Sequence, residues 1–97
     1  MARARRVDAN HGEVIKAFRK LGFSVADTSR LGGGFPDAVI SRQNKTAVVE
    51  IKDGSKVPSA RLLTKPELEF MKEWKGIYLL VESLGQVECI SIEWGKL

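Results

Sequence analysis

The chain lacks the features that mark secreted and membrane proteins. It contains a single cysteine, Cys89, so an internal disulfide is excluded, and one thiol alone cannot form a zinc site. No apolar run is long enough to span a bilayer, and the basic N-terminus is followed by polar residues instead of the apolar centre of a signal peptide. We therefore expect no membrane partner and a reducing compartment, the cytoplasm of a bacterium or of a virus-infected cell.

What the chain does have is an ordinary globular composition with an excess of positive charge. With 43% hydrophobic and 29% charged residues, it is expected to form one domain. Sixteen Lys and Arg against twelve Asp and Glu give a formal charge of +4, which favours a polyanionic partner. A chain of 97 residues buries too little surface for a deep cavity, so we expect an exposed cleft, or a groove shared with a second copy, and no small-molecule cofactor.

The first half of the chain predicts a helix followed by three strands. Residues 10–21 carry apolar side chains at helical spacing, and the run 23–28 is β-prone. A glycine-rich turn at 31–34 lets the backbone approach another segment closely and leads into Phe35-Pro36-Asp37. The apolar runs 38–40 and 47–49 are typical of central strands covered on both sides, with a polar hairpin at 42–45 between them.

The second half predicts a loop, a helix and two further strands. Residues 53–61 have two basic side chains and no periodicity, which indicates a mobile basic loop. Thr64 is the expected N-cap of a helix that runs to about Trp74. The apolar run 77–82 is a fourth strand, and the alternation in 87–93 predicts a short edge strand with Cys89 facing the core.

This order gives an α/β fold with an αβββαβ core, a mixed central sheet flanked by helices. The first helix packs on one face of the sheet, and the second crosses over between the hairpin and the later strand. Residues 1–9 are interpreted as a basic flexible arm and 10–97 as a single domain.

Three charged side chains are expected to meet on one face of the hairpin. Glu50 and Lys52 are two residues apart on one strand, so both project to the same side. Asp37 joins them only if its cross-strand partner is residue 50 or 52. A two-residue loop of Gln43-Asn44 gives the first pairing, and a loop one residue later gives the second; asparagine tolerates the positive φ that such turns need.

Two carboxylates held this close repel each other unless a cation lies between them. Their hard oxygen atoms suit Mg²⁺ or Mn²⁺, and the backbone carbonyl of Ile51 is a further candidate ligand. Such an ion activates water and stabilises charge that develops on a phosphodiester. Lys52 would orient or deprotonate the attacking water, or neutralise the developing oxyanion; the sequence leaves these roles open.

These residues resemble a known signature. Gly33-Gly34-Phe35-Pro36-Asp37 followed by Val48-Val49-Glu50-Ile51-Lys52 looks like the PD…ExK motif of the PD-(D/E)xK nuclease superfamily. With its small size, the helix that carries Glu13 and the helix start Leu63-Thr64-x-Pro66-Glu67, the chain is similar after about Asp8 to stand-alone VRR-NUC domains, the virus-type replication and repair nucleases.

The resemblance implies a restriction-endonuclease-like fold and a role for each matching residue. Asp37 and Glu50 would bind the metal, Lys52 would be the catalytic lysine, and Glu13 would be an outer acid that reaches the metal through water. Relatives often carry Gln where Glu67 aligns, and an acid at this position would alter the charge near the metal. Stand-alone members resemble Holliday-junction resolvases, which implies homodimers that cut branched DNA in replication, recombination or repair.

Several of these residues also have simpler interpretations. Glu13 and Glu67 both fit capping boxes, after Asn10 and Thr64 respectively, and for Glu67 we favour the cap. His11 is expected at the surface without a role, and the two tryptophans are expected in packing or at a dimer contact. Phosphate contacts are expected from the basic loop and the arm, through Lys56, Arg61, Arg3, Arg5 and Arg6.

The sequence therefore predicts a Mg²⁺-dependent DNA endonuclease that acts as a homodimer. Two alternatives have the same fold: a non-catalytic nucleic-acid-binding module, and an accessory nuclease subunit that needs a larger partner.

Overall fold

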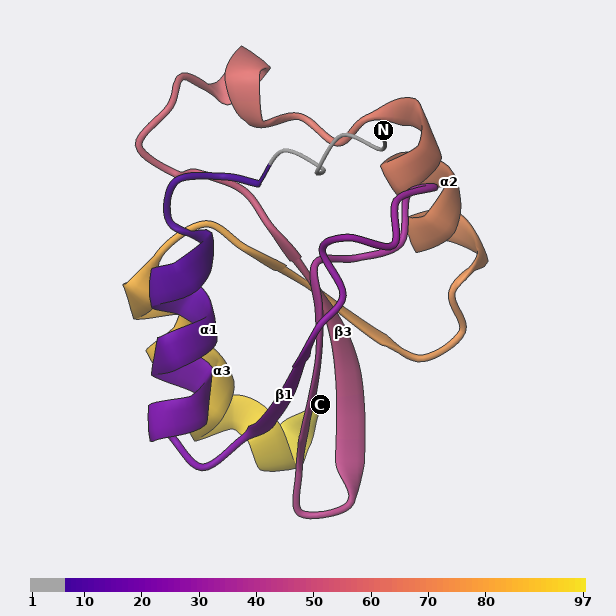
Figure 1. Ribbon diagram of the computed structural model, residues 1–97. Helices are drawn as coiled ribbons and strands as arrows, with labels where there is room; N and C mark the ends of the chain where they lie inside the picture. The colour runs from indigo at the N-terminus through magenta and orange to yellow at the C-terminus, as the bar shows by residue number, and fades with distance from the viewer. Residues whose placement is uncertain (1–6) are drawn as a thin grey trace.

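A four-stranded mixed sheet forms the centre of the computed structural model, in which residues 7–97 are described (Figure 1). The strands lie in chain order. Strand β1 is antiparallel to β2, β2 is antiparallel to β3, and β3 is parallel to β4. Their bounds are Ser24–Asp27 for β1, Ala38–Arg42 for β2, Lys45–Ile51 for β3 and Ile77–Val81 for β4.

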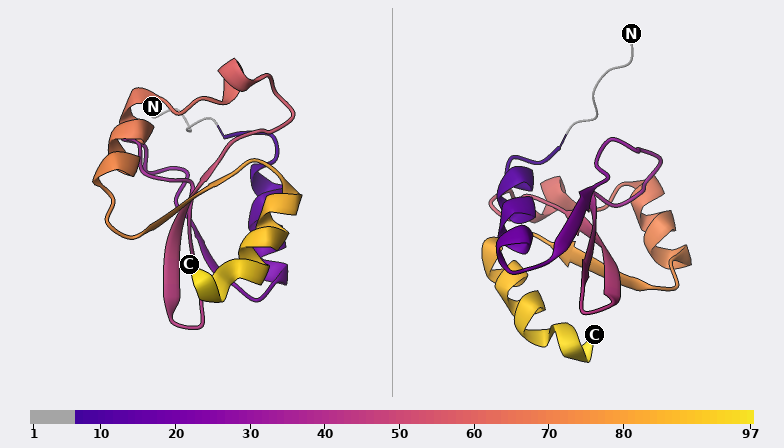
Figure 2. Two further views of the ribbon diagram at one scale, coloured as in Figure 1. Left: turned by 180° about the vertical axis from the view of Figure 1, so that it is seen from behind. Right: turned by 60° about the horizontal axis from the view of Figure 1, so that its bottom comes forward.

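Helices cover both faces of this sheet. Helix α1 (His11–Lys20) and helix α3 (Leu84–Glu93) lie side by side on one face, and α2 (Lys65–Glu73) lies on the other side (Figures 1 and 2). The expected mixed sheet flanked by helices is thereby confirmed. In the described part of the chain, no helix combines the length and the apolar character needed to cross a membrane.

The main core lies between the sheet and the pair α1–α3. It forms because each strand alternates its side chains between two faces, and the apolar stripe of α1 packs on one of them. The fully buried members include Val14, Phe18, Ile40, Val49 and Val81. The opposite face of β3 carries Val48 and Glu50, and this is the face that looks toward α2.

The β2–β3 hairpin follows the first of the two registers expected. Arg42 pairs with Lys45 across a two-residue turn, in which Gln43 and Asn44 have φ angles of 55° and 60°. Positive φ at both central positions is the signature of the tight turn whose twist matches a hairpin. This register fixes which residues of β2 and β3 lie opposite each other.

The chain from β3 to β4 crosses over through α2, as a parallel pair requires. The expected irregular segment 53–61 opens this connection, with one short 3₁₀ turn at Pro58–Arg61. Helix α2 begins with the predicted cap: the Thr64 hydroxyl accepts from the Glu67 backbone, and the Glu67 side chain accepts from the Thr64 backbone.

The predicted edge strand at 87–93 is wrong: these residues belong to helix α3. Ser83 caps it by accepting a hydrogen bond from the backbone N–H of Gln86, a local signal for a helix start. Val87, Ile90 and Trp94 are spaced by three and four residues and face the core, whereas Ile92 is exposed. The segment thus satisfies a helical spacing as well as the alternation that suggested a strand.

The helical conformation also corrects the expected position of Cys89, which is exposed rather than in the core. Trp94, in the 3₁₀ turn Trp94–Lys96, is instead the residue that closes the core, with 1% of its surface exposed. Its ring packs edge-on against Phe23, with 4.8 Å between the ring centroids. Its indole nitrogen donates to the Arg42 carbonyl oxygen at 2.8 Å. The expected packing role of Trp94 is confirmed.

A Trp94→Ala substitution should therefore lower the free energy of unfolding by about 3–5 kcal/mol, because it leaves a large cavity and an unpaired carbonyl. The measurement is urea denaturation followed by circular dichroism. Ile92→Ala, two residues earlier and 79% exposed, is the control and should change stability by no more than about 0.5 kcal/mol. Equal effects of the two substitutions would contradict the packing of α3 and its following turn.

Candidate active site

The hairpin register brings Asp37 beside Glu50. Ala38 pairs with Val49, so the residues just before and just after this pair, Asp37 and Glu50, are neighbours on the face toward α2. Both are buried, with 5% and 1% of their surfaces exposed. Asp37 is held in place by the backbone N–H of Ile51, which donates to its Oδ2 at 2.8 Å.

The turn before Asp37 is anchored on both sides. The backbone N–H of Thr28 donates to the Asp37 carbonyl at 2.9 Å, and the Thr28 hydroxyl donates to the Pro36 carbonyl at 2.7 Å. On the other side, Gly34 has a φ of +85°, and a β-carbon there would collide with the backbone of Pro66 at the start of α2. The expected close approach of the glycine-rich turn is thus to α2.

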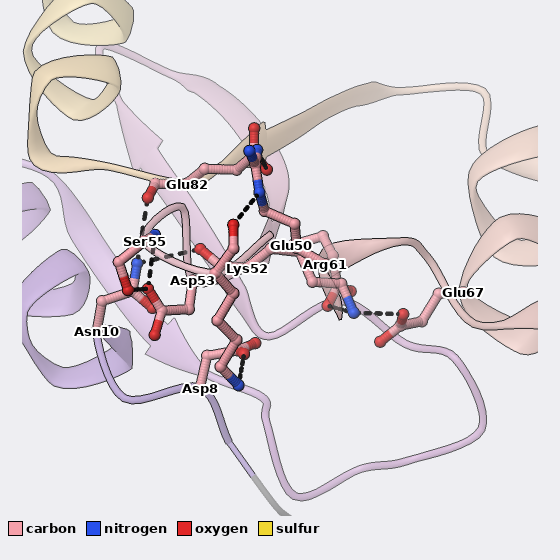
Figure 3. Close-up of polar contacts among 10 residues, drawn as sticks. Asp8, Asn10, Glu50, Lys52, Asp53, Ser55, Arg61, Glu67 and Glu82 are labelled. Carbon is pink, nitrogen blue, oxygen red and sulfur yellow. Dashed lines mark hydrogen bonds and ion pairs between the residues drawn. The ribbon is translucent and has the colours of Figure 1, made fainter. Parts of the chain in front are cut away.

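Lys52 and Glu67 complete a buried cluster with these two acids. The Lys52 ammonium lies 2.7 Å from Glu67 Oε1 and 3.9 Å from Glu50 Oε2, and Figure 3 shows Glu67 reaching from its helix to Lys52. Glu67 is 4% exposed and also accepts from the Thr64 backbone at 2.8 Å. The cap that we favoured for Glu67 is confirmed, but the same carboxylate also binds Lys52.

The cluster has an unusual electrostatic state because it holds three carboxyl groups and one ammonium. Burial, and then the neighbouring carboxyls of Asp37 and Glu67, raise the pKa of Glu50 to about 10. Burial acts in the same direction on Glu67, but hydrogen bonds from Lys52 and Thr64 outweigh it and lower its pKa. Glu50 is therefore the member that is protonated at neutral pH unless a cation replaces the proton.

The donor set fits a magnesium ion held by two protein carboxylates. Among residues 7–97, no three His, Cys, Asp or Glu side chains are grouped as a metal centre of their own. Mg²⁺, however, is commonly held by one or two carboxylates, with water and substrate oxygens as its other ligands. Oε1 of Glu50 is buried without a hydrogen-bond partner among the described residues, so this carboxylate keeps lone pairs for a water or a cation.

Glu13 occupies a different surface. It is exposed on α1 and lines a hollow of about 590 Å³ together with Asp53, Arg61 and Glu82. Asp37, Glu50 and Lys52 are not among the residues around this hollow. The outer-acid role of Glu13 remains a prediction.

The capping box that the sequence left open at Asn10 does not form. Asn10 makes no side-chain cap; its amide nitrogen instead donates to the carbonyl oxygens of Lys52 at 3.1 Å and of Glu82 at 3.5 Å. Asn10 thus connects the start of α1 to the residues that follow β3 and β4, because both carbonyls lie within reach of one amide (Figure 3).

The basic residues expected to contact phosphate differ in how far they are already paired. Arg61 donates to Glu82 Oε2 at 2.7 Å and to the Lys56 carbonyl at 2.9 Å. Lys56 is exposed and lies 3.8 Å from Asp8, so it is the more available cation of the two. Arg3, Arg5 and Arg6 lie outside the described residues.

Two contributors to the polar structure were not found from the sequence. His11 is buried, not at the surface as expected, and its Nε2 lies 3.0 Å from Asp27 Oδ2. Burial opposes ionisation of Asp27, but hydrogen bonds from Ser29 and His11 outweigh it and hold the Asp27 pKa at about 2. Tyr78 on β4 lies near the buried carboxylates, and no local pattern signals this, because its position depends on the pairing of β4 with β3.

A Glu50→Gln substitution should stabilise the metal-free protein, increasingly so toward alkaline pH. The unfolded chain releases the Glu50 proton near its ordinary value of 4.5, and the folded chain releases it near 10. Between these values unfolding releases a proton, so this group lowers stability as the pH rises. The free energy of unfolding is measured by urea denaturation in EDTA from about pH 5 to pH 9. It should fall with rising pH for the native protein and change less for the variant. Glu69→Gln, on the exposed side of α2, is the control and should show the same pH dependence of stability as the native protein. The same pH dependence in Glu50→Gln would contradict the raised pKa of Glu50.

Comparisons with protein-family models, with curated proteins and with solved structures find no match for this chain. The site is therefore interpreted from its own geometry. That geometry is two adjacent buried acids able to hold a divalent cation, with an ammonium group fixed next to them by a third acid.

Proposed function

We propose that the protein is a metal-dependent DNA endonuclease that hydrolyses phosphodiester bonds. One observation carries the proposal: Asp37, Glu50 and Lys52 lie on one face at the end of β3, all nearly inaccessible to solvent. Burying two ionised acids side by side is unfavourable, so Glu50 either keeps its proton or gains a counter-charge. A divalent cation supplies that charge and, when bound, activates water and stabilises negative charge on a phosphate ester.

Each residue of the cluster has a distinct part in this proposal. Asp37 and Glu50 hold the ion, with the Ile51 carbonyl as a further candidate ligand, and the N–H of Ile51 fixes the orientation of the Asp37 carboxylate. Lys52 neutralises the oxyanion that develops on the phosphate, or positions the attacking water. Glu67 is a positioning residue, because its carboxylate holds the Lys52 ammonium toward Glu50.

We further propose that the fold is restriction-endonuclease-like and that the chain is a VRR-NUC-type domain of the PD-(D/E)xK superfamily. The support is the order α1, β1, β2, β3, α2, β4 with a parallel β3–β4 pair, together with the Pro-Asp and Glu-x-Lys motifs at adjacent positions. In this fold α2 is the crossover element, and in this chain it also supplies Glu67 to the cluster.

The proposed substrate is branched DNA, cut by a homodimer with one site for each of two strands. The support is the net charge of +4, which favours a polyanion. The exposed Lys56 is the residue of the basic segment best placed to contact phosphate, because its ion pair with Asp8 is long.

One observation favours the alternative of a non-catalytic nucleic-acid-binding module or an accessory subunit. The Lys52 ammonium is already bound by Glu67 at 2.7 Å, and a buried ion pair of this kind is also a structural element. The alternative requires DNA binding without metal-dependent cleavage, or cleavage only when a partner is added, so one assay separates it from the proposal.

Lys52→Ala should lower the cleavage rate by about 100-fold or more, because the ammonium acts on charge that develops in the transition state. The measurement is a single-turnover assay on a labelled four-way junction with Mg²⁺, and EDTA should abolish cleavage by the native protein. Asp37→Asn should also reduce cleavage and weaken the binding of Mg²⁺.

Lys72→Ala is the matched control, since it removes the same charge from an exposed position on α2. It should cleave at the native rate. Cleavage by Lys52→Ala at the rate of Lys72→Ala would refute the role of Lys52, and the absence of cleavage by the native protein on every DNA tested would favour the binding module.

Branched DNA should be cut in preference to linear DNA, and the protein should migrate as a dimer. The reason is that two sites related by two-fold symmetry match two strands of a junction. Four-way-junction, flap, duplex and single-stranded DNA are compared in parallel, and light scattering gives the mass. Equal rates on all four substrates, or a monomer at the assay concentration, would contradict this substrate class.

A further inference from the structure

Tyr78 lies on β4 on the same face of the sheet as the carboxylate cluster. It pairs with Val48, and Glu50 pairs with Leu80, so Tyr78 is the diagonal neighbour of Glu50 across the parallel pair. The centroid of its ring lies 6.4 Å from that of Phe70 in α2. Phe70 is in turn stacked on Trp74, with 5.2 Å between their ring centroids. The aromatic contacts hold the ring beneath the helix that carries Glu67.

The hydroxyl group of Tyr78 is buried and has no hydrogen-bond partner among the described residues. Buried hydroxyl groups are nearly always hydrogen-bonded, so this one indicates a partner that residues 7–97 do not supply. Burial, and then the charges of Glu50, Glu67 and Asp37, raise the pKa of Tyr78 above its ordinary value. The phenol therefore stays neutral and is a hydrogen-bond donor that faces a group of acceptors.

Glu50 Oε1 is the complementary atom. It too is buried without a partner among the described residues, whereas Oε2 of the same carboxylate is the atom near Lys52, at 3.9 Å. Of the three carboxylates around Tyr78, Glu50 has the largest electrostatic effect on it. The two atoms make no direct hydrogen bond with each other, and one water between them would satisfy both.

We infer that Tyr78 is a positioning residue for Glu50: its hydroxyl donates through one enclosed water to Glu50 Oε1 and fixes the orientation of that carboxylate as a metal ligand. This inference rests on the proposed function, because it assigns to Glu50 the task of binding the ion. Partners that orient a metal-binding carboxylate change metal affinity when they are removed, even though they do not touch the metal.

The test is the binding of Mg²⁺ to Tyr78→Phe, measured by isothermal titration calorimetry without DNA. The substitution removes one oxygen atom and keeps the ring, so the fold should persist. We expect Mg²⁺ binding about 10-fold weaker than in the native protein, with the melting temperature in EDTA unchanged or higher. Trp74→Phe is the control: it alters the same aromatic stack, at a residue 40% exposed, and should keep native affinity.

A second readout comes from Tyr78 itself, because it is the only tyrosine in the chain. Tyrosine labelled with ¹³C at the ζ carbon gives one signal, whose position depends on the hydrogen bond of the hydroxyl. We expect Mg²⁺ to move this signal in the native protein. In EDTA, Glu50→Gln should move it further than Glu69→Gln does.

The outcomes separate the two proposals. Native protein that binds Mg²⁺ and cleaves DNA, with Tyr78→Phe at native Mg²⁺ affinity, would overturn the role of Tyr78 and leave the proposed function standing. Equal losses of affinity in Tyr78→Phe and Trp74→Phe would likewise overturn it, since packing would then account for the effect. Native protein that binds no Mg²⁺ would overturn both.

Discussion

The burial of Glu50 next to Asp37 is the constraint on which the rest of the site depends. A carboxyl group with 1% of its surface exposed, beside a second acid, is stable only if it keeps a proton or gains a cation. Both the proton and a cation would neutralise the same charge, so in the proposed function a metal ion and a proton compete for one position. The proposed ion binding is then coupled to proton release, as is general for carboxylate ligands that must lose a proton to bind.

Helix α2 organises the cluster from the opposite side. Its first turn supplies the Glu67 carboxylate to Lys52, its backbone at Pro66 lies against Gly34 before Asp37, and its Phe70 packs on Tyr78. A helix of nine residues thus contacts three segments that are far from one another in the sequence. The cap at Thr64 fixes Glu67 in the orientation that Lys52 needs, so one carboxylate both starts the helix and positions the ammonium.

Local signals predicted the central hairpin because they are strong and act over short distances. The sequence allowed a turn at 43–44 or at 44–45, and both placed Asp37 on the face of Glu50; the structure has the first. The segment 87–93 was ambiguous because its apolar residues fit both periods, and the cap at Ser83 was the signal that favoured a helix. The places of Tyr78 and His11 depend on how distant strands and helices pair, which no short pattern contains. The pairing of Glu67 with Lys52 belongs to the same group, because it requires the crossover to be in place.

The turn at Gln43-Asn44 sits at one end of the hairpin, whereas the carboxylates sit at the other. Because side chains alternate along a strand, one residue gained or lost at this turn would shift β2 against β3 by one position. Asp37 would then face the core beneath α1 and α3, and the apolar residues of β2 would exchange sides. Loop tips are usually where a domain accepts an inserted tag or a changed length, but in this chain the most remote loop sets the alignment of the site. Cutting the chain at this turn, with no residue added or removed, would keep each side chain of β2 and β3 on its present face of the sheet.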